Sequence, residues 1–202
     1  MPCDRAPQRK GEVKLSFRPL ERADFALLVR WLAAPHVAAW WREDADPDAV
    51  EARYGPCIDG ADPTELFVVE ADGVPVGMIQ RYRLAHEREW AASVEAALGN
   101  PGVPAAERTE GLSLQHAAGI DYLIGVEDMT GRGLGSRMID AFTVLTFERH
   151  PEVDQVVVAV QQQNAASWRA LENAGYRRVF AGTIDSGDPS DEGPGFLYVR
   201  RR

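Results

Sequence analysis

The stretch Gly119-Ile-Asp-Tyr-Leu-Ile-Gly125, followed by Met129-Thr-Gly-Arg-Gly-Leu-Gly-Ser-Arg-Met-Ile139, predicts a strand, a short turn, a glycine-rich loop and a helix. The first backbone N–H groups of a helix have no partner within the helix and can bind a phosphate. The three glycines of this loop let an anion approach the backbone closely, and Arg132 adds a positive charge. The stretch therefore indicates a pyrophosphate-binding loop.

Two common phosphate-binding loops do not fit this sequence. A nucleotide-hydrolysing P-loop needs Gly-Lys followed by Ser or Thr, whereas Gly135 is followed by Ser136 and then an arginine. A dinucleotide-binding loop needs a third glycine where this chain has Ser136. A simpler alternative is that the loop only caps the following helix.

Composition limits the class of protein. The 202 residues suffice for one well-filled domain, and we expect residues 1–12 to form a flexible tail and residues 13–202 the domain. Lys and Arg number 22 against 31 Asp and Glu, a net charge of −9, which argues against a nucleic-acid partner. The charge suits a cationic substrate, and an acidic, well-solvated surface alone would give the same value.

Cysteine and histidine usage gives a further expectation. Cys3 and Cys57 have no ligand-like spacing and are interpreted as free thiols of a reducing compartment. The four histidines also lack metal-ligand spacing, and no apolar run is long enough to span a bilayer. We therefore expect a cytoplasmic protein without a metal and without a membrane segment.

Hydrophobic periodicity predicts a mixture of strands and helices. The expected elements are a strand at 13–17, helices at 21–32 and 46–54, strands at 65–70, 74–82 and 119–125, a helix from 134 to about 148, a strand at 155–160, a helix at 165–173, and strands at 176–180 and 196–199. Pro35 is expected to end the first helix. Asp46 and Asn164 are expected to cap the helices that begin there, and Asp72-Gly73 is expected to form the hairpin turn between two strands. The irregular, acidic segment 85–117 is interpreted as an insertion that covers a substrate.

Two pairs of residues indicate a cleft. Trp40 and Trp41 are adjacent and cannot both face one core from a regular element, so at least one is expected to line a cleft unless both cover the edge of the core. In the strand at 74–82, Gln80 and Tyr82 share one face. That face is expected either to border a wet site or to hold a hydrogen-bonded core pair.

The strand, glycine loop and helix resemble motif A of the GNAT superfamily of N-acetyltransferases, and the segment from Asn164 to Tyr176 is similar to its motif B. The resemblance covers nearly the whole chain from Val13 onward. It implies an α/β (α+β) fold with a central mixed, mostly antiparallel sheet flanked by helices. It also implies acetyl-CoA as cofactor, held by Tyr122, Leu123, Ile124, Thr130, Gly131, Arg132, Gly133, Leu134, Gly135, Ser136, Asn164 and Ser167.

Within the superfamily, three segments look like those of the aminoglycoside 6′-N-acetyltransferases. They are Trp31-Leu-x-x-x-His36-Val-x-x-Trp40-Trp41, Gly77-x-x-Gln80-x-Tyr82 and Gly119-Ile-Asp121. The resemblance implies that Asp121 is the base or charge partner of the reacting amine. It places Trp40, Trp41, Gln80 and Tyr82 at the substrate site.

The chemistry of acetyl transfer gives these residues their roles. An amine must be neutral to attack a thioester, and the Asp121 carboxylate can take its proton. An alternative is that Asp121 only accepts hydrogen bonds from loop amides. Backbone N–H groups of the strand from Tyr122 to Gly125 can polarise the thioester carbonyl.

The sequence departs from the family at three positions. Thr130 stands where the family usually has Arg or Gln, and no Asp-Pro precedes Asn164. Leu171 occupies the position of the tyrosine that the family uses as a general acid, which leaves the acid unassigned.

The resulting hypothesis is an N-acetyltransferase acting on the 6′-amine of an aminoglycoside, as in antibiotic resistance. It would be a monomer or homodimer. The alternatives are an acyltransferase acting on a hydroxylysine-type amine in siderophore assembly, and a non-catalytic acyl-CoA binding protein.

Overall fold

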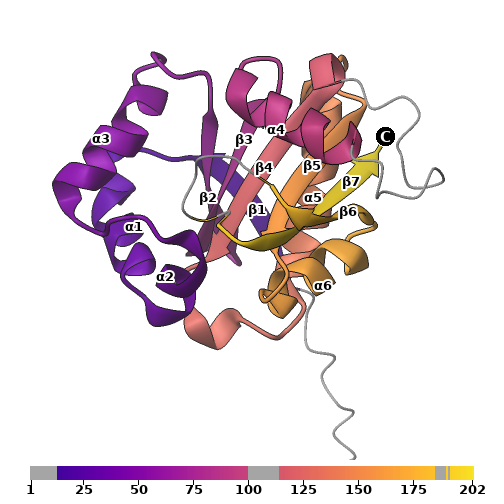
Figure 1. The fold of residues 1–202 in the computed structure, drawn as a ribbon. Helices are drawn as coiled ribbons and strands as arrows, with labels where there is room; N and C mark the ends of the chain where they lie inside the picture. The colour runs from indigo at the N-terminus through magenta and orange to yellow at the C-terminus, as the bar shows by residue number, and fades with distance from the viewer. Residues whose placement is uncertain (1–12, 100–113, 185–189, 191) are drawn as a thin grey trace, which may run out of the picture.

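The computed structural model describes residues 13–99, 114–184, 190 and 192–202 (Figure 1). Its centre is a seven-stranded sheet in the order β1-β2-β3-β4-β5-β7-β6. The strands are β1 (Leu15–Pro19), β2 (Glu65–Ala71), β3 (Val74–Arg83), β4 (Ala117–Ile124), β5 (Gln155–Gln161), β6 (Arg177–Thr183) and β7 (Pro194–Arg201). Every pairing is antiparallel except that of β4 with β5. The predicted mixed, mostly antiparallel sheet is confirmed.

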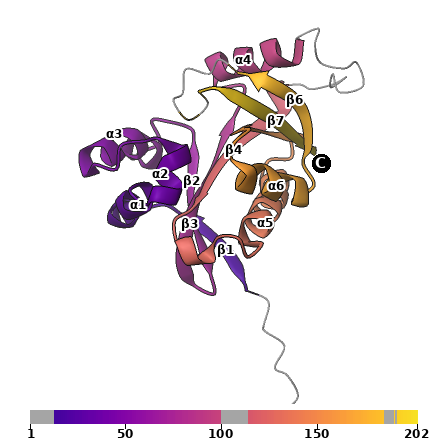
Figure 2. The same cartoon turned by 60° about the horizontal axis from the view of Figure 1, so that its bottom comes forward.

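Helices cover both faces of this sheet (Figure 2). They are α1 (Phe25–Leu32), α2 (Pro35–Trp41), α3 (Pro47–Ile58), α4 (Arg88–Gly99), α5 (Leu134–Arg149) and α6 (Ala165–Asn173), with 3₁₀ turns η1 (Arg22–Asp24), η2 (Leu114–His116) and η3 (Glu127–Met129). The helices α1 to α3 lie against one face and α5 and α6 against the other. Consecutive side chains of β5 point to opposite faces of the sheet. Val156 packs towards α5, and Val157 packs towards α4.

The structure corrects the N-terminal helix prediction. The expected helix at 21–32 consists of η1 followed by α1, and Pro35 begins α2 instead of only ending the preceding helix. A proline fits the first turn of a helix because the N–H that it lacks has no intrahelical partner there. Trp40 and Trp41 therefore lie in the last turn of a helix that the sequence reading missed.

Several local signals are confirmed. The Asp46 side chain accepts the Asp48 N–H at 2.9 Å and caps α3, which continues beyond the predicted end to Ile58. The Asn164 side chain caps α6 by accepting the Ser167 N–H at 3.1 Å. Asp72 and the glycine after it have φ angles of 53° and 78°, the left-handed conformation that a tight hairpin turn requires.

The segment that was expected to be irregular contains the helix α4. In α4, Val94 and Ala97 are buried in a cluster with apolar residues of β6 and β7. Residues 100–113 lie outside the described part, so the role of 85–117 as a substrate cover stays a prediction, as does the flexible tail at 1–12. Among the described residues, no helix has both the length and the apolar character that a membrane crossing requires.

The strands β4 and β5 pair only at their beginnings. The register runs from Ala117 opposite Gln155 to Gly119 opposite Val157, and no pairing follows. Gly119 is needed at this point because a Cβ there would collide with the ring of Tyr82. From Ile120 onward, β4 forms no ladder pairs with β5, and an opening lies between the two strands.

Candidate active site

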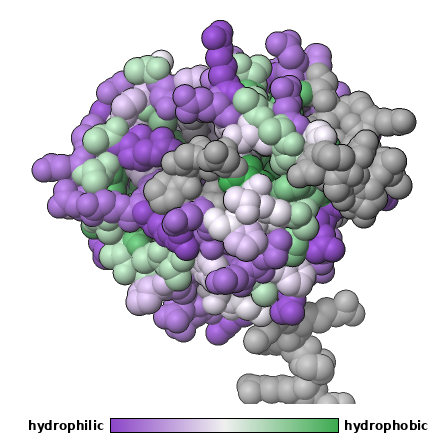
Figure 3. Space-filling model, viewed as in Figure 1, coloured by the Kyte–Doolittle hydropathy of each residue, from purple (hydrophilic) through white to green (hydrophobic). Residues whose placement is uncertain are grey.

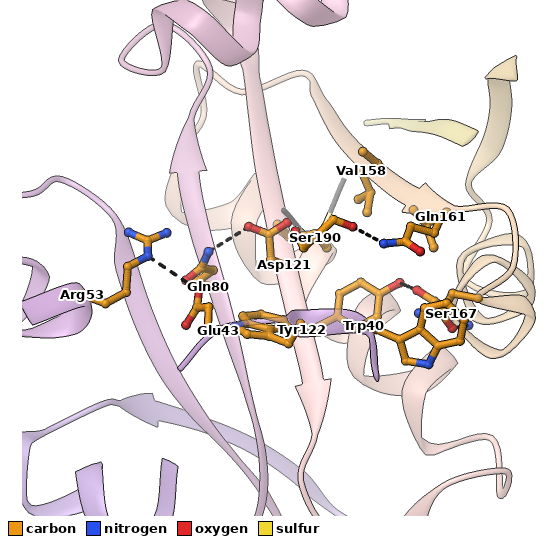
Figure 4. A pocket seen from close by; sticks show the side chains of 15 residues that line it. Trp40, Glu43, Arg53, Gln80, Asp121, Tyr122, Val158, Gln161, Ser167 and Ser190 are labelled. Carbon is orange, nitrogen blue, oxygen red and sulfur yellow. Dashed lines mark hydrogen bonds and ion pairs between the residues drawn. The ribbon is translucent and has the colours of Figure 1, made fainter. Parts of the chain in front are cut away.

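A pocket lies where β4 and β5 diverge, and its walls come from elements on both sides of the sheet (Figure 4). Ile120 to Tyr122 of β4 face Val158 to Gln161 of β5 across it, while α2, α3 and α6 contribute further side chains. Elements distant in sequence thus meet around an opening in the sheet, a usual place for a ligand site.

Asp121 lies in this pocket and is held by a neighbouring strand. Its Oδ2 accepts a hydrogen bond from Gln80 Nε2 at 2.8 Å, and the two residues are directly opposite in the β3–β4 register. Gln80 is only 5% exposed, yet it lines the pocket. Gln80 thus borders the pocket and forms a hydrogen bond to Asp121 within it.

On the Asp121 face of the sheet, the pocket continues into a groove between α3 and α4. Carboxylates of Asp62, Glu87, Glu89 and Asp121 line this groove, and among the described residues Arg53 is its one cationic side chain. The aromatic rings of Tyr82 and Trp90 also line it. Figure 3 shows hydrophilic side chains around a hollow in this face, with apolar side chains deeper inside. Such a groove attracts a positively charged ligand.

Both adjacent tryptophans line the pocket. Trp41 Nε1 donates to the Tyr54 hydroxyl at 3.2 Å, and this hydroxyl donates to Glu43 Oε2 at 2.5 Å. Burial and the nearby Glu43 carboxylate raise the pKa of Tyr54 far above its usual range, so its phenol stays protonated. This chain of hydrogen bonds fixes Trp41 and leaves Trp40 as a second aromatic wall.

Tyr122 contributes a side chain as well as a backbone to the pocket. Its hydroxyl forms a hydrogen bond of 2.7 Å with Ser167 Oγ, which links β4 to α6 (Figure 4). Burial raises the pKa of Tyr122, and the bond to Ser167 offsets only part of this effect. The phenol is therefore neutral at physiological pH.

The glycine loop has the geometry that its sequence predicts. Gly131 and Gly133 have φ angles of 68° and 76°, and a Cβ built on either residue meets nothing within 4 Å, so the loop borders open space. The helix α5 begins directly afterwards, and its first N–H groups point out of the helix into this space. Gly135 lies beside the side chains of Ile124 and Ala170, each 3.7 Å from the position of its absent Cβ. The loop thus adjoins β4 and α6, the elements that line the pocket.

The remaining loop positions differ in what they present. Arg132 is exposed, whereas the side chain of Leu134 is only 4% exposed and packs in the core, so only its backbone faces a ligand. The Thr130 hydroxyl donates to the Glu127 carbonyl at 2.8 Å and closes the turn before the loop. Ser136 follows in the first turn of α5, and Asn164 and Ser167 begin α6 at the other side of the pocket.

The backbone hydrogen bonds of β4 show which of its residues face the opening. The Gly125 N–H donates to the Val76 carbonyl at 2.9 Å, and the Ile124 carbonyl on the other side of that peptide accepts from His36 Nε2 at 2.9 Å. Because backbone groups alternate along an antiparallel strand, Tyr122 and Ile124 face the opening, and Leu123 faces β3. The Leu123 side chain is also buried against α1 and α3, so its predicted contact with the cofactor stays a prediction.

Several site residues were missed by the sequence reading. Glu43 and Arg53 form an ion pair at 3.6 Å on the pocket wall, and Gln161 donates to the Ser190 carbonyl at 2.5 Å across the pocket from them. They are isolated polar residues without a motif, and only the folding of α3 and β5 beside β4 brings them together. The acidic character of the segment around Glu87 was the one available signal for the groove.

Comparison with known proteins identifies a family. Residues 21–184 match the family model described as the acetyltransferase (GNAT) domain. The chain is 27% identical to the aminoglycoside N(6')-acetyltransferase type 1 of Klebsiella pneumoniae over 191 residues, which cover 93% of this chain and 83% of that protein. The protein of the same name from Serratia marcescens gives the same values.

Solved structures agree with this assignment. The aminoglycoside acetyltransferase AAC(6')-Ib in complex with coenzyme A aligns with a TM-score of 0.70 and 25% identity, covering 94% of this chain and 95% of that one. An uncharacterised protein from Bacillus halodurans, 20% identical, aligns with a TM-score of 0.72 over 94% of this chain and 84% of its own and shows the shared fold. Sequence and fold agree over most of the length, and this chain belongs to the GNAT family of acetyltransferases.

Proposed function

We propose that the protein transfers an acetyl group from acetyl-CoA to a primary amine of a small cationic substrate, namely the 6′-amine of an aminoglycoside. The acidic groove leading to Asp121 is the observation that carries this proposal. Aminoglycosides are polycations, and a groove whose described residues include four carboxylates and one arginine suits them. The relatives named for this activity share about a quarter of their residues with this chain.

The residues present fit acetyl-CoA. The glycine loop offers unobstructed backbone N–H groups at the start of α5, which suits a pyrophosphate. The opening between β4 and β5 provides an unpaired strand edge, with Tyr122 and Ile124 facing it, which suits the amide groups of a pantetheine chain. When bound, acetyl-CoA would supply an activated acetyl group as a thioester.

The chain's own groups would prepare the amine and hold the carbonyl. Asp121 would take the proton of the substrate ammonium, directly or through water, and Gln80 would keep the carboxylate oriented towards the pocket. The N–H groups of β4 that face the opening would donate to the carbonyl oxygen as negative charge develops there.

The proposal is tested by measuring coenzyme thiol release with aminoglycosides that carry either an amine or a hydroxyl at the 6′ position. Release with the 6′-amino members alone supports both the reaction and the position. If acetyl-CoA binds but no aminoglycoside promotes release, the aminoglycoside assignment is wrong. Hydroxylamine-bearing lysine derivatives and longer acyl donors would then be tested.

The glycine loop gives a separate prediction. Gly133→Ala places a Cβ at φ 76°, which costs about 1 kcal/mol and turns the neighbouring N–H groups away from their positions. We expect the Kd for coenzyme A, measured by calorimetry, to rise about tenfold, because several anion contacts weaken together. Gly73→Ala is the matched control, since Gly73 has φ 78° in the β2–β3 hairpin. An equal loss of affinity in both variants would contradict a pyrophosphate role for the loop.

A further inference from the structure

This chain lacks the tyrosine that donates a proton to the departing sulfur of coenzyme A elsewhere in the family. Leu171, at the position of the family's acidic tyrosine, is 0% exposed and packs in the core among residues of α5 and β5. The chain has five tyrosines, all in the described part. One of them can replace the missing phenol only if it reaches the opening between β4 and β5.

Four of the five tyrosines do not meet this requirement. Tyr176 shares a hydrogen bond with the Thr143 hydroxyl, and Tyr198 donates one to the Glu172 carboxylate. Neither tyrosine lines the pocket. Tyr54 is committed to the Glu43 carboxylate, and Tyr82 lines only the substrate groove, where its ring packs on Gly119.

Resting on the proposed function, we propose that Tyr122 is a catalytic residue of this protein and supplies the proton to the sulfur of coenzyme A as it leaves. Its phenol lines the pocket at the opening, one turn of α6 away from the position held by Leu171. The hydrogen bond to Ser167 holds the Tyr122 phenol against α6. This is the helix on which other members of the family carry the acid.

The position beside Asp121 in the chain places acid and base correctly. Consecutive residues of a strand point to opposite faces, so the Asp121 carboxylate lies on the groove side, and the Tyr122 ring packs on the α5–α6 side. Both still line one pocket, because the edge of β4 is unpaired after Gly119. A thioester in this opening would have the base on one face and the acid on the other.

The proton balance of the step is complete with these two groups. The amine nitrogen bonds to the acetyl carbon, the carbon–sulfur bond breaks, and its electron pair goes to the sulfur. The substrate ammonium first loses one proton through Asp121 to solvent, so that the attacking amine is neutral. On attack, Asp121 receives the second proton from the nitrogen, and the Tyr122 hydroxyl gives one to the sulfur. Asp121 then releases its proton to solvent. The phenolate then regains a proton from solvent, with Ser167 as a hydrogen-bond donor in the meantime.

Burial affects this role in two ways. It keeps Tyr122 protonated at neutral pH, as a proton donor must be before each turnover, and the raised pKa makes the phenol a weaker acid. A thiolate is a stable leaving group, so we expect a smaller contribution than from most general acids.

The test uses Tyr122→Phe with two readouts. The kcat is expected to fall roughly 10- to 100-fold with the KM for acetyl-CoA nearly unchanged. The pKa of the coenzyme A thiol in the binary complex, followed by thiolate absorbance against pH, is expected to rise by about one unit, because the donor that stabilises the thiolate is gone. The second readout needs no amine, so it tests Tyr122 even if the aminoglycoside assignment fails.

A control variant separates this role from a structural one. Tyr176→Phe removes another buried phenol bonded to a hydroxyl, Thr143 Oγ1 at 2.6 Å, and should leave both readouts as in the wild type. An unchanged bound thiol pKa in Tyr122→Phe, or an equal rise in Tyr176→Phe, overturns the proposal.

Discussion

Replacing Asp121 with asparagine is expected to lower the kcat of acetyl transfer by about 10²- to 10³-fold, within the range of general-base contributions. Asparagine keeps the size of the side chain and can still accept the hydrogen bond from Gln80 Nε2. It cannot take a proton from the substrate ammonium. Steady-state kinetics with a saturating 6′-amino substrate would measure kcat, and calorimetry would measure coenzyme A affinity, which should stay within about twofold.

Asp140→Asn is the matched control for this prediction. Asp140 is a carboxylate on α5 that pairs with Arg200 at 2.5 Å and does not line the pocket or the groove. An exposed ion pair contributes little to stability, so its kinetics should match the wild type. If Asp121→Asn keeps full turnover, Asp121 is a structural acceptor for Gln80, and the amine must lose its proton to water or another group.

Much of the fold could be predicted because it depends on local signals. The Asp72-Gly73 hairpin, the Asn164 cap and the β-branched run of β5 each follow from residues close together in the sequence, and each is confirmed. Pro35 shows the limit of such signals. Proline both follows one helix and begins another, and in this fold α2 packs on the core through its buried residue Val37.

The candidate site divides in the same way. The glycine loop and Asp121 lie within one strand–loop–helix unit, so the sequence alone predicts that they are close in space. Arg53 lies on α3 and Glu43 in the loop before it, and both line the pocket. Their neighbours in the sequence form no motif from which this position could be predicted. The side chain of Tyr122 was likewise interpreted only as backbone, because its partner Ser167 lies 45 residues away.

Arg81 is a further residue that periodicity alone misplaces. It follows Gly77 and Ile79 on the face of β3 that packs against α5, and it is only 1% exposed. Its guanidinium bonds to Glu65 Oε2 at 2.6 Å and to Thr146 Oγ1 at 3.2 Å, and it lies 5.6 Å from the ring centres of Phe67 and Phe142. Burial lowers the pKa of Arg81, and the Glu65 carboxylate opposes this effect. The core thus contains a charge held by a half-exposed partner.

Three substitutions should therefore differ in their effect on the free energy of unfolding. Arg81→Ala leaves a cavity between two phenylalanine rings and should cost about 3–4 kcal/mol. Glu65→Ala leaves the buried guanidinium without its carboxylate and should cost about 2 kcal/mol, less than for a fully buried pair because water reaches this end. Arg81→Met should stay within about 1 kcal/mol of the wild type, because it fills the volume and removes the buried charge.

Urea unfolding followed by circular dichroism would measure all three variants. The methionine variant is the informative one, because each of its remaining polar neighbours keeps a partner. Thr146 Oγ1 still donates to the Phe142 carbonyl at 2.8 Å, and Glu65 still lies 3.1 Å from His150 Nε2. If Arg81→Met destabilises the protein as much as Arg81→Ala, the charge itself stabilises the core, and the ion pair outweighs its desolvation. If it does not, volume and aromatic contact explain why a long side chain lies at this position of β3.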